Sequence, residues 1–304
     1  MAETVVVTGA SGFIAKHIIA ELLRRGFAVR GTIRDPAKST SVARAVEAAG
    51  ASSAHLSFAV ADLNANHGWD EAVKGAAFTV HSASPFPMEQ PSLADDVIRP
   101  AREGTLRVLR AAHRTGFKRV VLTSSTVAVM YPPGYTREHV FSEADFTDEN
   151  TPGLTPYIRS KTIAEKAAWD FVNATPAAPQ LAAINPGFVQ GPALDGDLST
   201  SHELYRLMAR GIYPAAPRIR FPVCDVRDVA AAHAQALMLP EAAGHRYIIA
   251  NGETGLFALG QALAAECPDL KKKVPKFQLP DTAVRTLAVF DKRLRTVLPE
   301  LGRE

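Results

Sequence analysis

The chain has few cysteines and no long apolar segment, and these absences limit the classes of protein to which it can belong. Cys224 and Cys267 are the only cysteines in 304 residues. Two thiols are too few for a disulfide framework or a zinc site, and they favour a reducing compartment. No stretch approaches the roughly 18 consecutive apolar residues of a membrane span. A strand-like run begins at Thr4 and leaves no room for a signal peptide before it, so we expect a cytoplasmic protein without a membrane partner.

The net charge is also small, and runs of like charge are short. The net charge is +3, and the longest run of like charge is Lys271-Lys272-Lys273. Such a short run is typical of a solvated loop, and we expect no nucleic-acid partner. The histidines are dispersed without metal-ligand spacing, so we expect no metal. A composition of 47% hydrophobic and 21% charged residues indicates a globular protein, with one large domain or two unequal lobes.

What the sequence does contain is an alternation of strand and helix patterns over its first half. Near-continuous apolar or β-branched runs predict strands at residues 4–8, 29–33, 55–60, 78–83, 119–123 and 181–185. Amphipathic stretches predict helices at residues 13–25, 38–49 and 97–115. Apolar strands separated by helices indicate a parallel sheet that is covered on both faces. The predicted fold class is therefore α/β, a doubly wound parallel sheet of the Rossmann type.

The alternation loosens after Pro186. Residues 187–224 are rich in Gly, Pro and aromatic residues, with a single predicted helix at 202–210. The patterns that follow predict helices at 225–239, 256–266 and 281–298 and a strand at 247–250. We therefore predict a dinucleotide-binding domain at residues 1–186 and a mainly substrate-binding lobe at residues 187–304, in which residues 223–250 return to the first domain.

A glycine-rich turn, Thr8-Gly9-Ala10-Ser11-Gly12-Phe13-Ile14-Ala15, follows the first predicted strand and opens the first helix. Gly9 permits a tight turn, Gly12 lets a pyrophosphate approach, and the helix N-terminus supplies N–H donors and a positive dipole. The spacing Gly-x-x-Gly-x-x-Ala is one residue longer than the usual dinucleotide fingerprint. A turn without ligand is the alternative interpretation.

The end of the second strand bears on the choice of cofactor. Arg34 follows that strand and Lys38 lies one helical turn further on. Two cations there favour the 2′-phosphate of NADP, because a guanidinium offers bidentate contacts. Asp35 could cap the next helix, which we favour, or accept a ribose hydroxyl in an NAD enzyme.

Tyr157 and Lys161 are four residues apart, so on a helix they share a face. A cation beside a phenol lowers the pKa of the phenol. Ser125 lies just beyond the strand that ends at Thr123, at the sheet edge where doubly wound proteins bind ligands. A hydroxyl there can hydrogen-bond a carbonyl to which Tyr157 supplies a proton. Ser124 and Ser125 both stand at this edge, and the sequence does not decide which faces the substrate.

On these features the chain resembles the extended short-chain dehydrogenases/reductases, in particular the group of dihydroflavonol reductase, cinnamoyl-CoA reductase and microbial aldehyde (carbonyl) reductases. The resemblance spans nearly the whole length. Beyond the glycine turn and the Tyr157-x-x-x-Lys161 pair, it rests on Arg34-Asp35, Asp62-Leu63, Val80 to Pro85, Thr123-Ser124-Ser125, Pro186 to Pro192 and Asp225 to Ala230. Ala15 departs from the plant enzymes and is similar to the microbial reductases.

The resemblance implies a catalytic set of Ser125, Tyr157 and Lys161 and a bound NADP(H). The implied cofactor contacts are Gly9, Ser11, Gly12, Phe13, Ile14, Arg34, Lys38, Asp62, Leu63, Ser82, Ala83, Ser84, Tyr157, Lys161, Pro186, Gly187 and Val189. Apolar residues that could wall a substrate pocket, or equally pack between the lobes, are Phe86, Val127, Tyr131, Phe188, Tyr205, Met208 and Phe221.

The predicted activity is NADPH-dependent reduction of a ketone or aldehyde to an alcohol, with Tyr157 as proton donor and a small-molecule carbonyl as substrate. The alternatives are a nucleotide-sugar epimerase or dehydratase that retains its cofactor and a non-catalytic NADP sensor. For the epimerase, the candidates to bind a nucleotide diphosphate are Arg206, Arg210, Arg218 and Arg220. A monomer and a homodimer are both compatible with the sequence.

Overall fold

The structure is a computed structural model that describes residues 2–84, 94–136, 138–196, 199–290, 294 and 297–301. Its centre is a seven-stranded sheet with the order β10-β6-β5-β4-β1-β2-β3, in which every paired strand runs parallel. These strands are β1 (Thr4–Val7), β2 (Ala28–Ile33), β3 (Leu56–Val60), β4 (Phe78–His81), β5 (Arg119–Thr123), β6 (Gln180–Pro186) and β10 (Arg246–Ile249).

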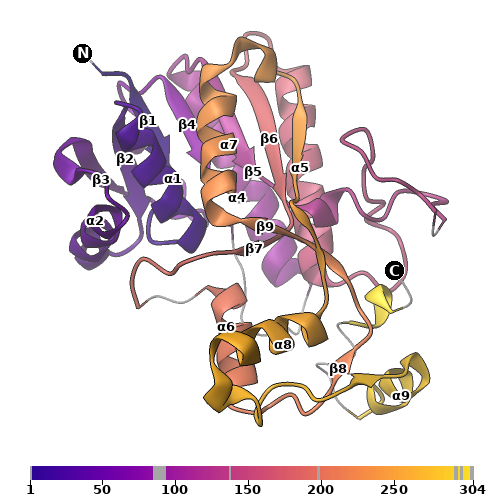
Figure 1. Cartoon of the computed structure of the whole chain (residues 1–304). Coiled ribbons are helices and arrows are strands. Elements are labelled where there is room, and N and C mark those ends of the chain that lie inside the picture. The colour runs from indigo at the N-terminus through magenta and orange to yellow at the C-terminus, as the bar shows by residue number, and fades with distance from the viewer. Residues whose placement is uncertain are drawn as a thin grey trace.

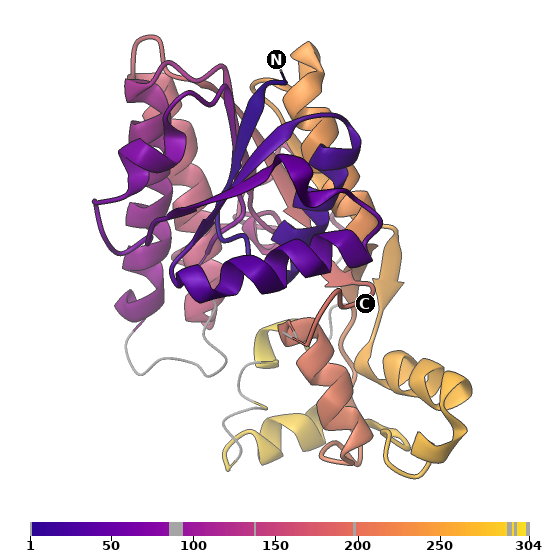
Figure 2. The same ribbon diagram turned by 90° about the vertical axis from the view of Figure 1, so that its left-hand side faces the viewer.

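Helices cover both faces of this sheet (Figures 1 and 2). One face carries α1 (Phe13–Arg24), α2 (Ser39–Ala48) and α7 (Val226–Met238), and the other carries α3 (Trp69–Val73), α4 (Asp95–Arg114) and α5 (Pro156–Ala174). Along β1, Val5 and Val7 pack into the core under α1, whereas Val6 packs into the core under α4, and all three are fully buried. Because both faces are buried, the central strands are apolar throughout. The predicted doubly wound α/β fold is confirmed.

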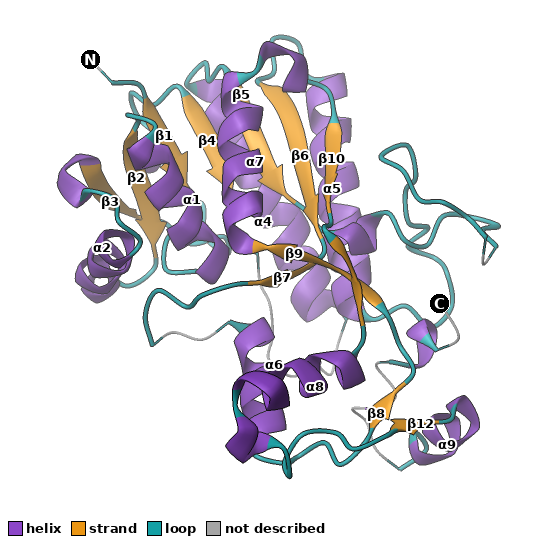
Figure 3. Cartoon of the chain, in the orientation of Figure 1, coloured by secondary structure: helices purple, strands orange, loops and turns teal. Residues whose placement is uncertain are grey.

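A smaller lobe lies beyond the carboxyl ends of the central strands (Figures 1 and 3). It contains α6 (Thr200–Ala209), α8 (Leu256–Glu266), α9 (Asp281–Leu287) and the short paired strands β8 (Ala216–Pro217) and β12 (Gln278–Leu279). A three-stranded sheet of β7 (Phe188–Gln190), β9 (Phe221–Asp225) and β11 (Gly252–Thr254) stands at the junction. After β9 the chain returns to the central sheet, where α7 packs on α1 and β10 pairs with β6.

The helix predicted at residues 281–298 is not continuous in the part of the chain that the structure describes. The described helix α9 ends at Leu287. Beyond it the amides of Val289 and Phe290 donate to carbonyls only three residues earlier, those of Thr286 and Leu287. Bonds of this kind tighten the last turn and end an α-helix.

Candidate active site

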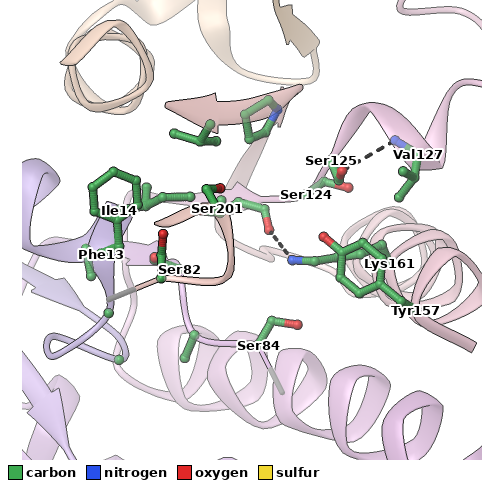
Figure 4. A pocket seen from close by; sticks show the side chains of 18 of the residues that line it. Phe13, Ile14, Ser82, Ser84, Ser124, Ser125, Val127, Tyr157, Lys161 and Ser201 are labelled. Atoms are coloured by element: carbon green, nitrogen blue, oxygen red, sulfur yellow. Dashed lines mark hydrogen bonds between the residues drawn. The ribbon is translucent and has the colours of Figure 1, made fainter. Parts of the chain in front are cut away.

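A cavity of about 1210 Å³ opens at the carboxyl ends of the central strands, between the sheet and the smaller lobe. The glycine turn after β1, the ends of β2 to β5 and residues 186–189 line it from the sheet side. In the strand order, β1 lies between β4 and β2, so the chain changes direction across the sheet at this point. Doubly wound proteins bind their ligands at such a switch point. Figure 4 shows Phe13 and Ile14 on one side of the cavity and Ser125, Tyr157 and Lys161 on the other.

The glycine turn has the geometry of an anion-binding loop. Gly9 has φ +67°, and a Cβ built there would lie 2.9 Å from the Cβ of Ala83. Gly12 is the N-cap of α1, with no side chain capping the helix and no acidic residue in its first turn. The first amides of α1 therefore point toward the cavity without a competing carboxylate, an arrangement that suits a pyrophosphate.

A buried hydrogen-bond chain holds this turn against the end of β4. The amide of Ala83 donates to Oγ1 of Thr8 over 2.9 Å. His81 joins Thr8 to Thr105, with Nδ1 2.9 Å from Oγ1 of Thr8 and Nε2 3.2 Å from Oγ1 of Thr105. Burial, together with the charge of the nearby Lys161, lowers the pKa of His81 to about 3. The neutral imidazole thus links α4 to the loop of Ser82, Ala83 and Ser84, all three of which line the cavity.

The cofactor contacts expected after β2 and β3 differ in whether they line the cavity. Arg34 is exposed and lines the cavity, as do Asp62 and Leu63. Lys38 is the last residue of a short helical turn at Pro36–Lys38; it is exposed and does not line the cavity. Asp35 caps that turn, since its Oδ1 accepts from the amide of Ala37 over 2.9 Å. This contact is the one that we favoured for Asp35.

The first two turns of α5 carry Tyr157 and Lys161 into the cavity. Thr155 caps the helix by accepting from the amide of Ile158 over 3.3 Å, and Pro156 occupies its first turn, where a missing N–H costs nothing. Lys161 is buried, and its Nζ donates to the carbonyl of Thr123 over 3.4 Å. The phenol and the ammonium group thus reach the cavity beside the end of β5.

The protonation of Tyr157 differs from the sequence-based expectation. Burial raises the pKa of Tyr157 to about 12, and its hydrogen bond with Ser125 acts in the opposite direction. Burial also lowers the pKa of Lys161 to about 8, against the attraction of Glu165. The net shift of the Tyr157 pKa is therefore upward and not downward as expected, because the loss of solvent outweighs the hydrogen bond. The phenol is neutral at pH 7.

Ser124 and Ser125 differ in what their hydroxyls contact. Ser124 Oγ donates to Glu165 Oε2 over 2.5 Å, on the α5 side of the strand end. Ser125 Oγ accepts from the amide of Val127 over 3.4 Å and hydrogen-bonds with Tyr157. Ser125 is therefore the serine whose hydroxyl meets the phenol (Figure 4).

Most of the remaining predicted residues line the cavity. They are Gly9, Ser11, Gly12, Phe13, Ile14, Val127, Pro186, Gly187, Phe188, Val189 and Phe221. Phe86 lies outside the described residues.

Three residues predicted for the substrate pocket do not line it. Tyr131 is 1% exposed, because it packs against Leu154 and Ile158. Met208 is fully buried inside the smaller lobe. Tyr205 follows Leu204 on α6, and one residue further along a helix is a turn of about 100°, which takes it off the cavity-facing side.

Several cavity residues carried no recognisable signal in the sequence. The smaller lobe contributes Ser199, Ser201, Leu204, Ile219, Pro222, Leu256, Val297 and Glu300, and α4 contributes Asp96, Val97 and Pro100. These residues come from separate helices, strands and turns with no common motif. Only the packing of the lobe against the sheet brings them together.

The sequence model of the NAD dependent epimerase/dehydratase family matches residues 5–250, and the chain belongs to this family. It is 33% identical to a ketoreductase of Aspergillus niger over 96% of this chain and 90% of that one. It is also 33% identical to a cinnamoyl-CoA reductase of Medicago truncatula, over 95% of this chain and 91% of the relative. The solved structure of Gre2 from Candida albicans in complex with NADPH has a TM-score of 0.78 at 28% identity, covering 98% of this chain and 97% of Gre2.

These similarities confirm the predicted family, an oxidoreductase and a nicotinamide cofactor. No helix in the described parts of the chain is long and apolar enough to cross a membrane. Among the same residues, no group of three or more His, Cys, Asp or Glu side chains is arranged to hold a metal ion.

Proposed function

We propose that this protein reduces an uncharged ketone or aldehyde to an alcohol with NADPH. The observation that carries the proposal is the meeting of Ser125, Tyr157 and Lys161 in the cavity that the glycine turn of α1 also lines. A dinucleotide with its pyrophosphate at that turn would extend toward these three side chains.

The proposal of NADPH over NADH rests on Arg34. Its guanidinium is exposed at the mouth of the cavity, where it can make bidentate contacts to a 2′-phosphate. Asp35, the residue that would favour NADH, is engaged in capping the turn at Pro36–Lys38. The similarity to Gre2, whose structure contains NADPH, supports the same choice.

Each catalytic side chain has a separate role in this proposal. Bound NADPH supplies the hydride that the carbonyl carbon receives. Ser125 donates a hydrogen bond to the carbonyl oxygen and stabilises its developing negative charge. Tyr157 then gives its proton to that oxygen, which completes the alcohol, and regains a proton from solvent. The Lys161 ammonium group favours the transient phenolate electrostatically.

The charges of the cavity wall support an uncharged substrate. Among the described lining residues, only Arg34 and Lys161 are cationic, whereas Asp62, Asp96 and Glu300 are acidic. The substrate side is mostly apolar, with contributions from Val127, Met130, Phe188, Leu204, Ile219, Phe221 and Leu256.

The competing activity is that of an epimerase or dehydratase, which the name of the family includes. Such an enzyme must bind a nucleotide diphosphate through cations. None of Arg206, Arg210, Arg218 and Arg220 lines the described cavity. Arg206 and Arg220 instead pair with Glu203 and Glu253. Apart from Arg34 and Lys161, the described cavity wall therefore has no cation that could bind the diphosphate of a sugar nucleotide.

The experiment that tests the proposal is a measurement of NADPH and NADH oxidation with aromatic aldehydes, keto esters and flavanonols. We expect stoichiometric NADPH consumption with at least one class, and slower oxidation of NADH. If none of these compounds causes net oxidation but a UDP-sugar is isomerised without added cofactor, the epimerase is the correct assignment.

A further inference from the structure

A buried carboxylate lies directly behind the proposed catalytic residues. Glu165 follows Lys161 by four residues on α5, one turn further from Tyr157, and is fully buried. It accepts hydrogen bonds from Ser124 Oγ over 2.5 Å, Asn185 Nδ2 over 2.9 Å and Trp169 Nε1 over 3.2 Å. None of the three donors belongs to the proposed catalytic set.

Arg246 of β10 balances the charge of Glu165. Its Nε lies 2.6 Å from Glu165 Oε1, and the two side chains are 6% and 0% exposed. The remaining guanidinium donors reach the carbonyls of Ala128, Glu143 and Asp145, all in the segment between β5 and α5. The ion pair therefore joins α5, the sheet edge and the loop that begins at Ser125.

The same network reaches the backbone of Ser125. Asn185 Nδ2 donates both to Glu165 Oε2, over 2.9 Å, and to the carbonyl of Ser125, over 3.1 Å. Ser124, its neighbour in the chain, is bound to the same carboxylate oxygen. Two hydrogen bonds centred on Glu165 thus fix the peptide from which the Ser125 hydroxyl extends toward Tyr157.

A buried ion pair is not required for stability, because apolar side chains of similar volume often serve a core equally well. We propose that Glu165 is a positioning residue for the reduction: held by Arg246, it fixes the Ser124-Ser125 peptide so that the Ser125 hydroxyl lies against Tyr157. This inference rests on the proposed function of the site.

A second consequence concerns Lys161. The titratable side chains that face it are Tyr157, His81 and Glu165. Of these, Glu165 supplies the attraction that raises the pKa of Lys161 against the effect of burial. Without this carboxylate the ammonium group should lose its proton at a lower pH. The decline of activity on the alkaline side should then begin at a lower pH, a change that loss of packing alone would not cause.

The test compares Glu165→Gln, Glu165→Asp and the control Arg119→Met in the full-length protein. Gln keeps the shape of the side chain but turns an NH₂ group toward donors, whereas Asp keeps the charge. Arg119 is also a buried arginine, but it lies at the opposite end of β5, where it donates to carbonyls at the end of α7. Its loss should lower thermal stability without affecting Ser125.

For E165Q we expect kcat to fall by about tenfold to a hundredfold, the cost of misplacing a reacting group by roughly 1 Å. The dissociation constant of NADPH, measured by fluorescence, should change less than about threefold, since Glu165 does not line the cavity. The alkaline limb of kcat should move to lower pH in E165Q and less in E165D. R119M should lose thermal stability and keep the pH profile of the unchanged protein.

The inference fails if E165Q keeps its kcat and its pH profile, or if R119M reproduces both changes in proportion to its loss of stability. A failure of the proposed function is distinguishable, because then the unchanged protein would not oxidise NADPH with any carbonyl compound.

Discussion

At the scale of single residues, Tyr157 has the protonation state that a reductive proton donor needs. Burial raises its pKa to about 12, so the phenol carries its proton at neutral pH. A neutral phenol can give that proton to an oxygen that becomes an alkoxide. In the proposed reaction, Lys161 matters most after proton transfer has begun, because the phenolate then needs a cation nearby.

Tyr157→Phe is expected to lower kcat by about a thousandfold, the typical contribution of a general acid. The dissociation constant of NADPH should stay within a few-fold, because the ring remains in position. Stopped-flow oxidation of NADPH and fluorescence titration measure the two effects. Tyr247→Phe is the matched control, since Tyr247 is half-buried on β10, outside the cavity lining. Near-normal turnover of Y157F would show that another group supplies the proton.

Arg34→Ala is expected to raise the KM for NADPH by about tenfold to a hundredfold, the usual worth of hydrogen bonds to a charged group. The KM for NADH should change little, because NADH lacks the 2′-phosphate. Lys38→Ala should have a smaller effect, since Lys38 does not line the cavity. Equal losses for both cofactors in R34A would place the guanidinium away from the 2′-phosphate. Steady-state kinetics with each cofactor separate these outcomes.

At the scale of elements, the glycine turn is constrained by conformation and by space at once. Gly9 adopts φ +67°, and any Cβ there meets Ala83, whose amide is held by Thr8. The turn, β4 and the loop after β4 must therefore keep their spacing for α1 to present its amides to the cavity. This close approach explains why a glycine and not an alanine stands two residues after the end of β1.

Gly9→Ala should destabilise the folded protein by about 1–2 kcal/mol, because an alanine at this position must adopt the left-handed conformation. The added Cβ should also displace the Ala83 loop. Gly116→Ala is the control, because Gly116 has φ +70° with nothing within 4 Å of the added Cβ. Both variants should lose stability in urea unfolding, but only G9A should also weaken NADPH binding. Unchanged NADPH affinity in G9A would mean that the Ala83 loop yields without disturbing the cofactor site.

At the scale of the whole molecule, two buried neutral histidines make the fold sensitive to acid. Burial lowers the pKa of His81 to about 3 and that of His233 to about 4. Both imidazoles are bonded on each ring nitrogen, His233 to Thr123 Oγ1 and the carbonyl of Val229, each over 2.7 Å. Protonation would force the threonine hydroxyl that donates to each ring to accept instead, and it would bury a charge.

In the unfolded chain these histidines take up protons near pH 6.5, whereas in the folded protein they do so only below about pH 4. The unfolded state therefore binds more protons between these values, and the free energy of unfolding falls as the pH drops. Near pH 5 each histidine contributes about 1.4 kcal/mol per pH unit to this slope. Urea unfolding at pH 7, 6 and 5 measures this slope of the free energy of unfolding against pH. In His233→Asn the slope should fall by the contribution of one histidine. An unchanged slope in H233N would mean that His233 is already protonated in the folded state.

The sequence by itself determined the central sheet, because its strands are short apolar runs whose signal is local. The strand predicted at residues 119–123 is β5, and the helix predicted at 256–266 is α8. The glycine turn and the pair of Tyr157 and Lys161 were also visible, since a turn and a helical spacing of four are written in consecutive residues. Family membership followed from the order of such short motifs.

Only the tertiary structure decided which side chains enclose the cavity. Tyr131 and Met208 are as apolar as the residues that line it, yet both are buried elsewhere. Glu165 and Arg246 stand 81 positions apart and meet because α5 packs on the sheet near its β10 edge. Burial, which raises the pKa of Tyr157, likewise depends on what packs around the phenol. Contacts between distant segments and the loss of solvent leave no local pattern in a sequence, and so they had to come from the folded chain.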